Sequence, residues 1–152
     1  MPQVRMTRET RADVDAVWAV TTDWKRHAGY FPLTQMKVPD EPEGVGRHFE
    51  GFSKLGPLTL PDPMVVTAWS PPSPVEGHDS GSFAIRKLGK VLSGTVNFEV
   101  HPTPGGATLV WTTDVGPAPR LLATISRPVG GLITKAMYAG VLKKIVAAAE
   151  AH

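Results

Sequence analysis

Two strand-like segments joined by a tight turn, followed by a long segment with one apolar stripe, constrain the fold of this chain most. Ser93–His101 and Ala107–Val115 alternate apolar and polar residues on either side of Pro104-Gly105-Gly106. Alternation with a period of two is typical of half-buried strands, and a glycine-containing link is typical of a hairpin. We therefore expect an antiparallel hairpin that leads into one long closing helix, an arrangement that encloses a pocket between sheet and helix.

The C-terminal segment carries apolar residues at spacings of three and four, as expected for a helix that buries one stripe. The stripe consists of Leu122, Ile125, Val129, Ile133, Met137, Val141 and Ile145. Pro128, followed by Gly130 and Gly131, interrupts it. Because proline removes a backbone donor, the sequence predicts a break or kink near Arg127–Gly131, with Pro128 as the first residue of the long segment.

The sequence before Ser93 predicts further short strands, with two short helices near the N-terminus. Asp13 is placed to cap a helix that begins at Val14, and a second short helix is expected over Trp24–Tyr30. The predicted strands are Val4–Arg11, Thr34–Val38, Arg47–Lys54, Met64–Trp69 and Ser82–Arg86. Phe49 and Phe52 share a strand face only with a bulge, which is expected near Gly51. Antiparallel strands with helices at the start and the end indicate an α+β fold.

Length and composition favour one folded unit. The chain has 152 residues, of which 41% are hydrophobic and 20% charged, so a single domain over residues 1–152 is expected and a disordered chain is excluded. There is no cysteine, which excludes disulfides, thiolate nucleophiles and Cys-ligated zinc and suits a reducing compartment. No signal peptide and no apolar run of about 18 residues is visible. We expect a cytoplasmic protein without a transmembrane segment.

The charge distribution bears on the choice of partners. The net charge of +2 is too small to argue for nucleic-acid binding. From Gly116 onward, five basic residues stand against Glu150 alone. This basic terminal helix either favours an anionic ligand, lipid or acidic partner, or is an ordinary solvated face whose Lys143 and Lys144 complement the helix dipole.

An ordered set of short motifs resembles the START-like superfamily, also called SRPBCC or polyketide cyclase/dehydrase-like. Ala12–Asp23 is similar to its entry pattern A-x-x-x-x-V-W-x-x-x-x-D. Further matching motifs, which together cover essentially the whole chain, are Gly44–Arg47, Trp69–Pro72, Gly94–Val100 with Pro102, Gly105-Gly106, Trp111 and the long terminal helix.

The resemblance implies an α+β helix-grip fold, in which a curved antiparallel sheet of about seven strands surrounds a C-terminal helix and two short helices follow the first strand. It also implies a deep, mostly apolar cavity. Members of the superfamily bind lipids, sterols, polyketides, plant hormones or aromatic ligands, and some are cyclases or dehydratases. The superfamily has no universal catalytic residue, so the resemblance predicts a pocket without assigning chemistry.

Motifs for cofactors, metals and nucleophiles are weak or absent. Gly44-Val45-Gly46 lacks the third glycine of a dinucleotide-binding loop, and Gly130–Lys135 is not a phosphate-binding loop. The five histidines include no pair at a spacing of four residues. There is no G-x-S-x-G motif. We expect neither a bound cofactor nor a metal site.

General acid–base chemistry remains open to a small group of polar strand residues. His48 and Glu50 share a strand face, where they form either a base with its orienting partner or a solvent-facing pair. Arg86 either points into the cavity, where it needs an anionic partner, or lies on the outer sheet surface. Asp114 falls by parity on the face opposite Trp111. These are the catalytic candidates.

The aromatic and apolar residues are the stronger candidates for ligand binding. Those expected to line the pocket are Tyr30, Phe31, Phe49, Phe52, Phe98, Trp111, Met137 and Val141. Tyr30 is expected as a polar group near the mouth, and Met137 and Val141 as the floor contributed by the long helix. Ordinary packing of the helix on the sheet is the alternative.

Three functions follow from these expectations. The first is binding or transport of a hydrophobic small molecule. The second is a cyclase or dehydratase acting on a polyketide-like or aromatic substrate, which requires a titratable group inside the cavity. The third is a ligand-free interaction module, which a cavity already filled by aromatic side chains would favour.

Overall fold

The structure, a computed structural model, describes residues 3–89, 92–117 and 120–152, with only the backbone described at 55, 74, 92, 116, 117 and 120–134. Its seven strands form one antiparallel sheet in the order β1-β7-β6-β5-β4-β3-β2. The strands are β1 (Val4–Thr10), β2 (Thr34–Lys37), β3 (His48–Leu55), β4 (Leu58–Ser70), β5 (Gly81–Leu88), β6 (Leu92–Thr103) and β7 (Gly106–Pro117). The helices are α1 (Val14–Thr21), η1 (Trp24–Arg26), α2 (His27–Tyr30), η2 (Pro74–Glu76) and α3 (Arg120–Glu150).

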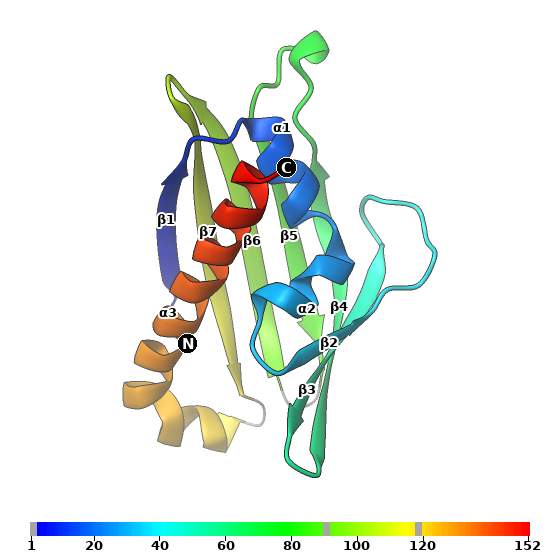
Figure 1. Cartoon of the computed structure of the whole chain (residues 1–152). Helices are drawn as coiled ribbons and strands as arrows, with labels where there is room; N and C mark the ends of the chain where they lie inside the picture. Colours follow the sequence, from blue (N-terminus) through cyan, green and yellow to red (C-terminus); the bar gives the residue numbers. More distant parts are fainter. Residues whose placement is uncertain (1–2, 90–91, 118–119) are drawn as a thin grey trace.

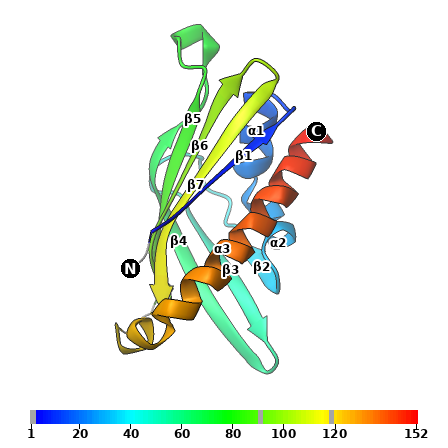
Figure 2. The same cartoon turned by 90° about the vertical axis from the view of Figure 1, so that its left-hand side faces the viewer.

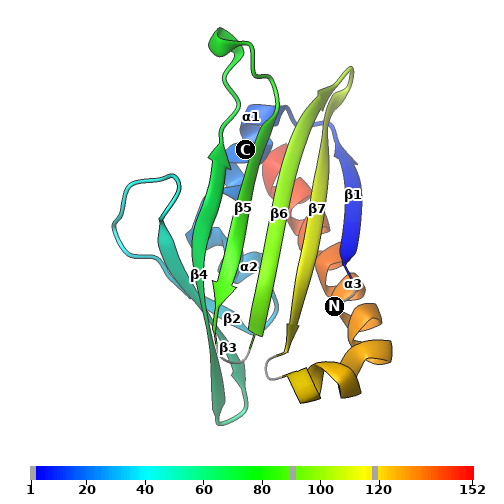
Figure 3. The same cartoon turned by 180° about the vertical axis from the view of Figure 1, so that it is seen from behind.

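The sheet curves around the long helix. Figure 1 shows α1, α2 and α3 on one face of the sheet, Figure 2 shows α3 running obliquely across that face, and Figure 3 shows the outer face free of helices. This is the predicted α+β helix-grip fold. Among the described residues no helix is long and apolar enough to cross a membrane.

The β6–β7 hairpin has the predicted alternation. Val96, Phe98 and Val100 are nearly or fully buried on the inner face of β6, and Phe98 lies opposite Trp111 of β7. Asp13 caps α1 as expected, because its Oδ1 accepts a hydrogen bond from the Ala16 amide at 2.8 Å. Local sequence signals therefore determine these elements directly.

The long helix begins earlier in the chain than predicted. It is one continuous helix from Arg120 to Glu150, so it does not begin at Pro128. Figure 3 shows its first, gold part running at an angle to the orange and red remainder. The stripe residues Leu122, Ile125, Val129 and Ile133 have side chains outside the described residues. Farther along, Val141 and Ile145 are fully buried.

The irregularity in the sheet also lies elsewhere than predicted. The β3–β4 register is regular through Gly51, so Phe49 and Phe52 lie on opposite faces of β3, and the bulge expected near Gly51 is wrong. The register shift falls instead in β4, between Val66 and Ala68. Strand β4 also begins earlier than the predicted Met64.

The early start of β4 is possible although it contains two prolines. Met64 is the first β4 residue paired with β5, at Lys87. Pro61 and Pro63 are paired with β3 only. Proline cannot donate to a ladder, and it is tolerated where a strand has one free edge. The prolines therefore occupy the part of β4 that projects beyond β5.

Candidate ligand-binding cavity

A cavity of about 240 Å³ lies between the inner face of the sheet, α2 and α3. Its lining comes from α2, α3 and strand segments near the β3–β4 hairpin. In Figure 1, α2 and this hairpin lie below α1. The lining residues are His27, Phe31, Pro32, Thr34, Met36, Phe49, Gly51, Ser53, Asp62, Met64, Ile85, Lys87, Val96, Trp111, Val115, Met137 and Tyr138. We call this region the cavity end of the molecule.

Most of the wall is apolar, and part of it is adaptable. Phe49 and Trp111 are buried walls contributed by the sheet. Met36, Met64 and Met137 line the cavity and are only partly buried. Methionine has three rotatable bonds and fills irregular gaps. The cavity can therefore fit its shape to apolar ligands of different outline.

An ion pair is set into this apolar wall. Lys87 Nζ donates a hydrogen bond to Asp62 Oδ2, and the two side chains are only 10% and 13% exposed. The residues reach each other diagonally, because Lys87 lies opposite Met64 and Asp62 is two positions before Met64. The other carboxylate oxygen, Asp62 Oδ1, is buried and has no hydrogen-bond partner among the described residues.

Two further lining residues carry polar groups. Trp111 Nε1, a donor, is buried without an acceptor in the described part of the chain. His27 lies 2.7 Å through Nε2 from the Thr21 carbonyl oxygen, which can only accept. Nε2 therefore carries the proton, and Nδ1 carries the lone pair. Burial lowers the pKa of His27 to about 4, so its ring is neutral at neutral pH.

The predicted ligand-binding residues divide into two groups. Phe31, Phe49, Trp111 and Met137 line the cavity. The other four lie elsewhere. Phe98 and Val141 are fully buried in the core, and Phe52 is on the outer face of β3. Tyr30 is not at the mouth; its hydroxyl donates to the Val20 carbonyl at 3.0 Å, and burial raises the pKa of its phenol.

None of the four catalytic candidates lines the cavity. His48 and Arg86 are exposed, and Glu50 and Asp114 are half-buried on the face opposite the inward residues Phe49 and Trp111. The titratable residues that do line it, His27, Asp62, Lys87 and Tyr138, were not among the candidates. Lys87 had a usable signal, because it continues the inward row of Phe83 and Ile85 at a spacing of two.

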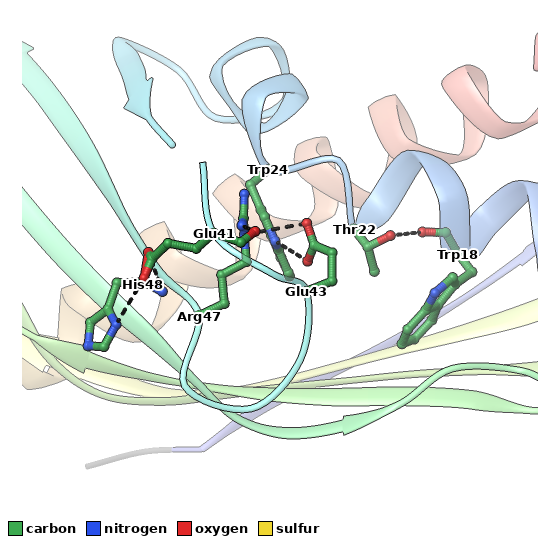
Figure 4. Close-up of polar contacts among 7 residues, drawn as sticks. All are labelled: Trp18, Thr22, Trp24, Glu41, Glu43, Arg47 and His48. Carbon is green, nitrogen blue, oxygen red and sulfur yellow. Dashed lines mark hydrogen bonds and ion pairs between the residues drawn. The ribbon is translucent and has the colours of Figure 1, made fainter. Parts of the chain in front are cut away.

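His48 belongs to a polar network that fixes the loop before β3 (Figure 4). Glu43 joins the two buried partners of this network, 3.4 Å from Arg47 Nε and 3.1 Å from Trp24 Nε1. Arg47 also donates to the Glu41 carbonyl, and Glu41 lies 4.0 Å from His48 Nδ1. The network ties this loop to η1, away from the cavity lining.

The lysines of the terminal helix do not line the cavity. Lys135, Lys143 and Lys144 are exposed on α3, while Arg120 and Arg127 have side chains outside the described residues. Within the described residues, no three His, Asp or Glu side chains are grouped closely enough to hold a metal ion.

Solved structures show the same fold at low sequence identity. The chain is similar to the protein TTHA0849 from Thermus thermophilus, with a TM-score of 0.76, 14% identity, and coverage of 99% of this chain and 98% of that one. The Zhui aromatase/cyclase from Streptomyces sp. R1128 has a TM-score of 0.72 at 15% identity, with 98% and 93% covered. The two-domain aromatase/cyclase StfQ of the steffimycin biosynthetic pathway has a TM-score of 0.73 at 15% identity, with 97% of this chain and 50% of that chain covered.

No curated protein sequence matches the chain significantly. A family profile described as polyketide cyclase / dehydrase and lipid transport matches residues 1–150. The match spans every strand and the whole of α3. The chain therefore belongs to the polyketide cyclase / dehydrase and lipid transport family.

Proposed function

We propose that the protein binds a hydrophobic small molecule in the cavity between the sheet and α3, and carries or presents it. The observation that supports this most is an unfilled space of about 240 Å³ with a mainly apolar wall. Protein cores are normally packed with few voids larger than a water molecule. A space of this size with adaptable methionines is suited to a guest molecule.

The size and the walls favour a small aromatic or polyketide-like ligand. Ligand pockets commonly measure about 300–1,000 Å³, so this cavity suits a compact molecule of about two fused rings. Phe31 and Trp111 line it with their rings 6.4 Å apart between centroids. Aromatic walls pack favourably against flat rings. A bulky lipid would need the methionine side chains to move aside.

Native mass spectrometry of the purified protein, followed by organic extraction, tests the proposal. We expect an adduct that yields an apolar or aromatic compound, or one that forms after incubation with aromatic, polyketide and lipid mixtures. A clean unliganded mass under all of these conditions would contradict the proposal. That outcome would favour the ligand-free interaction module, against which the unfilled cavity argues.

A cyclase or dehydratase activity is the second candidate. It is supported by the family and by the titratable groups His27, Asp62 and Lys87 in the cavity lining. Such groups can take or give a proton during carbonyl condensation or loss of water. Incubation with a poly-β-keto thioester, with products followed by liquid chromatography and mass spectrometry, tests it. Cyclised product that disappears in Asp62→Asn supports the enzyme; spontaneous products alone contradict it.

We also propose that the protein acts in the cytoplasm. The sequence contains no cysteine and so makes no use of an oxidising compartment. Fractionation of the source cells, with immunodetection of the protein, tests this location. Recovery with the membranes or outside the cells would contradict it.

A further inference from the structure

The Asp62–Lys87 pair is an unusual element for an apolar cavity. Both side chains are about nine-tenths buried, and both line the cavity. Burying two charges is costly, and a buried ion pair adds little stability compared with apolar residues of similar size. Packing alone therefore gives little reason for the pair, and its position in a ligand cavity suggests recognition.

The pair has unused hydrogen-bonding capacity of both kinds. Asp62 Oδ1 is buried and accepts no hydrogen bond from the described residues. A lysine ammonium has three N–H donors, and those of Lys87 are directed to Asp62 Oδ2 and, at 3.8 Å, to Met64 Sδ. In this structure Asp62 Oδ1 is covered by neighbouring atoms, so a ligand reaches this acceptor only when the Asp62 side chain rotates. One N–H donor of Lys87 remains as well.

The charge of the lining is also balanced. Asp62 and Lys87 offset each other, and the remaining titratable lining residues are His27 and Tyr138. A ligand with a negative charge would have to approach the Asp62 carboxylate as well as the lysine. In a low-dielectric site that repulsion is poorly screened. A neutral group that both donates and accepts a hydrogen bond avoids this cost.

We propose that the Asp62–Lys87 pair selects ligands carrying a neutral hydroxyl group, a phenol, enol or alcohol, over apolar and anionic molecules of the same size. The Asp62 carboxylate rotates to accept a hydrogen bond from the ligand hydroxyl, and the hydroxyl accepts one from Lys87 Nζ. Its apolar body lies against Phe31, Phe49 and Trp111. This inference rests on the proposed function, because it requires that a small molecule enters the cavity.

Three probes of similar size test the selection by isothermal titration calorimetry at neutral pH. They are 2-naphthol, 2-methylnaphthalene and 2-naphthoate, which carry a hydroxyl, a methyl and a carboxylate group. Leaving a buried polar site unpaired is costly. We expect 2-naphthol to bind about tenfold more tightly than 2-methylnaphthalene, and 2-naphthoate to bind most weakly.

A double variant isolates the pair. Asp62→Asn with Lys87→Met removes both charges together, so no unpaired charge is left buried and the fold is expected to persist. The preference for 2-naphthol over 2-methylnaphthalene should fall to within about twofold. The matched control, Asp40→Asn with Lys54→Met, changes two exposed side chains and should keep the full preference.

The single variant Asp62→Asn should reverse the preference between 2-naphthol and 2-naphthoate. Asp62→Asn leaves Lys87 as an unpaired cation, so 2-naphthoate should become the preferred probe over 2-naphthol. Circular dichroism establishes whether this variant folds; if it does not, the double variant alone carries the test.

The possible failures can be told apart. If none of the three probes binds the wild-type protein, the proposed function fails and this inference fails with it. Equal affinities for 2-naphthol and 2-methylnaphthalene would overturn the selection and leave cavity binding intact. An unchanged preference in the double variant would also overturn it.

Discussion

The two ends of the sheet's inner face differ in what fills them. The end under α1, which we call the packed end, is filled by Trp18, Trp24, Trp69 and Phe83. Trp18 and Trp69 lie 5.1 Å apart between ring centroids, and Trp24 lies 5.2 Å from Phe83. The cavity end, under α2 and α3, keeps an open space of about 240 Å³ and contains a buried ion pair.

Two glycines show the difference at atomic scale. A Cβ built on Gly81, at the packed end, would lie 2.7 Å from Trp18 Cε3 and 2.9 Å from Pro72 Cδ. A Cβ on Gly51, at the cavity end, would first meet Met36 Sδ at 3.5 Å, an ordinary contact. One end of the same sheet has no room for a methyl group, whereas the other accepts one. The packed end stabilises the fold, and the cavity end is available for function.

Removing an aromatic residue at the packed end should destabilise the protein more than any other change considered below. Trp24 is 1% exposed and stacks on Phe49 at 4.5 Å. Trp24→Ala should lower the free energy of unfolding by about 3–5 kcal/mol, because it leaves a cavity in dense core. Met36→Ala should cost only about 1 kcal/mol, because the Met36 side chain is partly exposed at the cavity wall. Urea denaturation measures both, and equal losses would remove the distinction between the ends.

Acidification should lower the stability of the protein through protonation of His27. Folding lowers its pKa from 6.5 to about 4, mainly by burial. Between these values the unfolded chain binds a proton that the folded protein does not, so stability falls as the pH falls from 6.5 to about 4. The loss contributed by His27 reaches about 3 kcal/mol.

His27→Gln should flatten this part of the pH profile of unfolding free energy. The exposed His78→Gln serves as the matched control and should keep the wild-type slope. The same slope in wild type and His27→Gln would show that His27 is not buried as a neutral ring.

Alanine substitutions at Gly81 and Gly51 should change stability by different amounts. Gly81→Ala should destabilise the protein by about 1–3 kcal/mol, because its methyl group overlaps the Trp18 ring. Gly51→Ala should change stability by no more than about 0.5 kcal/mol. Thermal denaturation of the two variants compares the ends with the same chemical change. A tolerated Gly81→Ala would mean that the packed end can relax.

Filling the cavity should affect stability little and ligand binding strongly. Met137 lines the cavity and is half-buried, so the ring of Met137→Trp can enter open space. Its stability should change by less than about 1 kcal/mol, whereas binding of 2-methylnaphthalene should be lost. Calorimetry and urea denaturation measure the two quantities. Destabilisation by several kcal/mol would show that this position is solid core.

The sequence predicted the elements whose signals are local. The alternation in β6 and β7, the Asp13 cap and the stripe residues Val141 and Ile145 lead directly to the hairpin, α1 and the buried face of α3. The family resemblance supplied the closed arrangement of sheet and helix. Four of the aromatic and apolar candidates, Phe31, Phe49, Trp111 and Met137, line the cavity.

The ion pair was missed because both of its strands were predicted too short. The predicted strand began at Met64 and so left out Asp62. Pro61 and Pro63 also speak against a central strand there, but that rule does not apply where β4 pairs with β3 alone. Lys87 fell one residue beyond the predicted strand Ser82–Arg86, although parity with Ile85 places it inward. The proximity of Asp62 and Lys87 depends on the β4–β5 register, which no single strand reveals.

The indole N–H signals of the four tryptophans report which end of the sheet binds a ligand. In a ¹⁵N-resolved NMR titration with 2-naphthol, we expect a saturable shift of the Trp111 signal at the cavity end. The Trp18, Trp24 and Trp69 signals, from the packed end, should stay close to their starting positions. A static Trp111 signal, or shifts confined to the packed end, would contradict the claim that the cavity end binds the ligand.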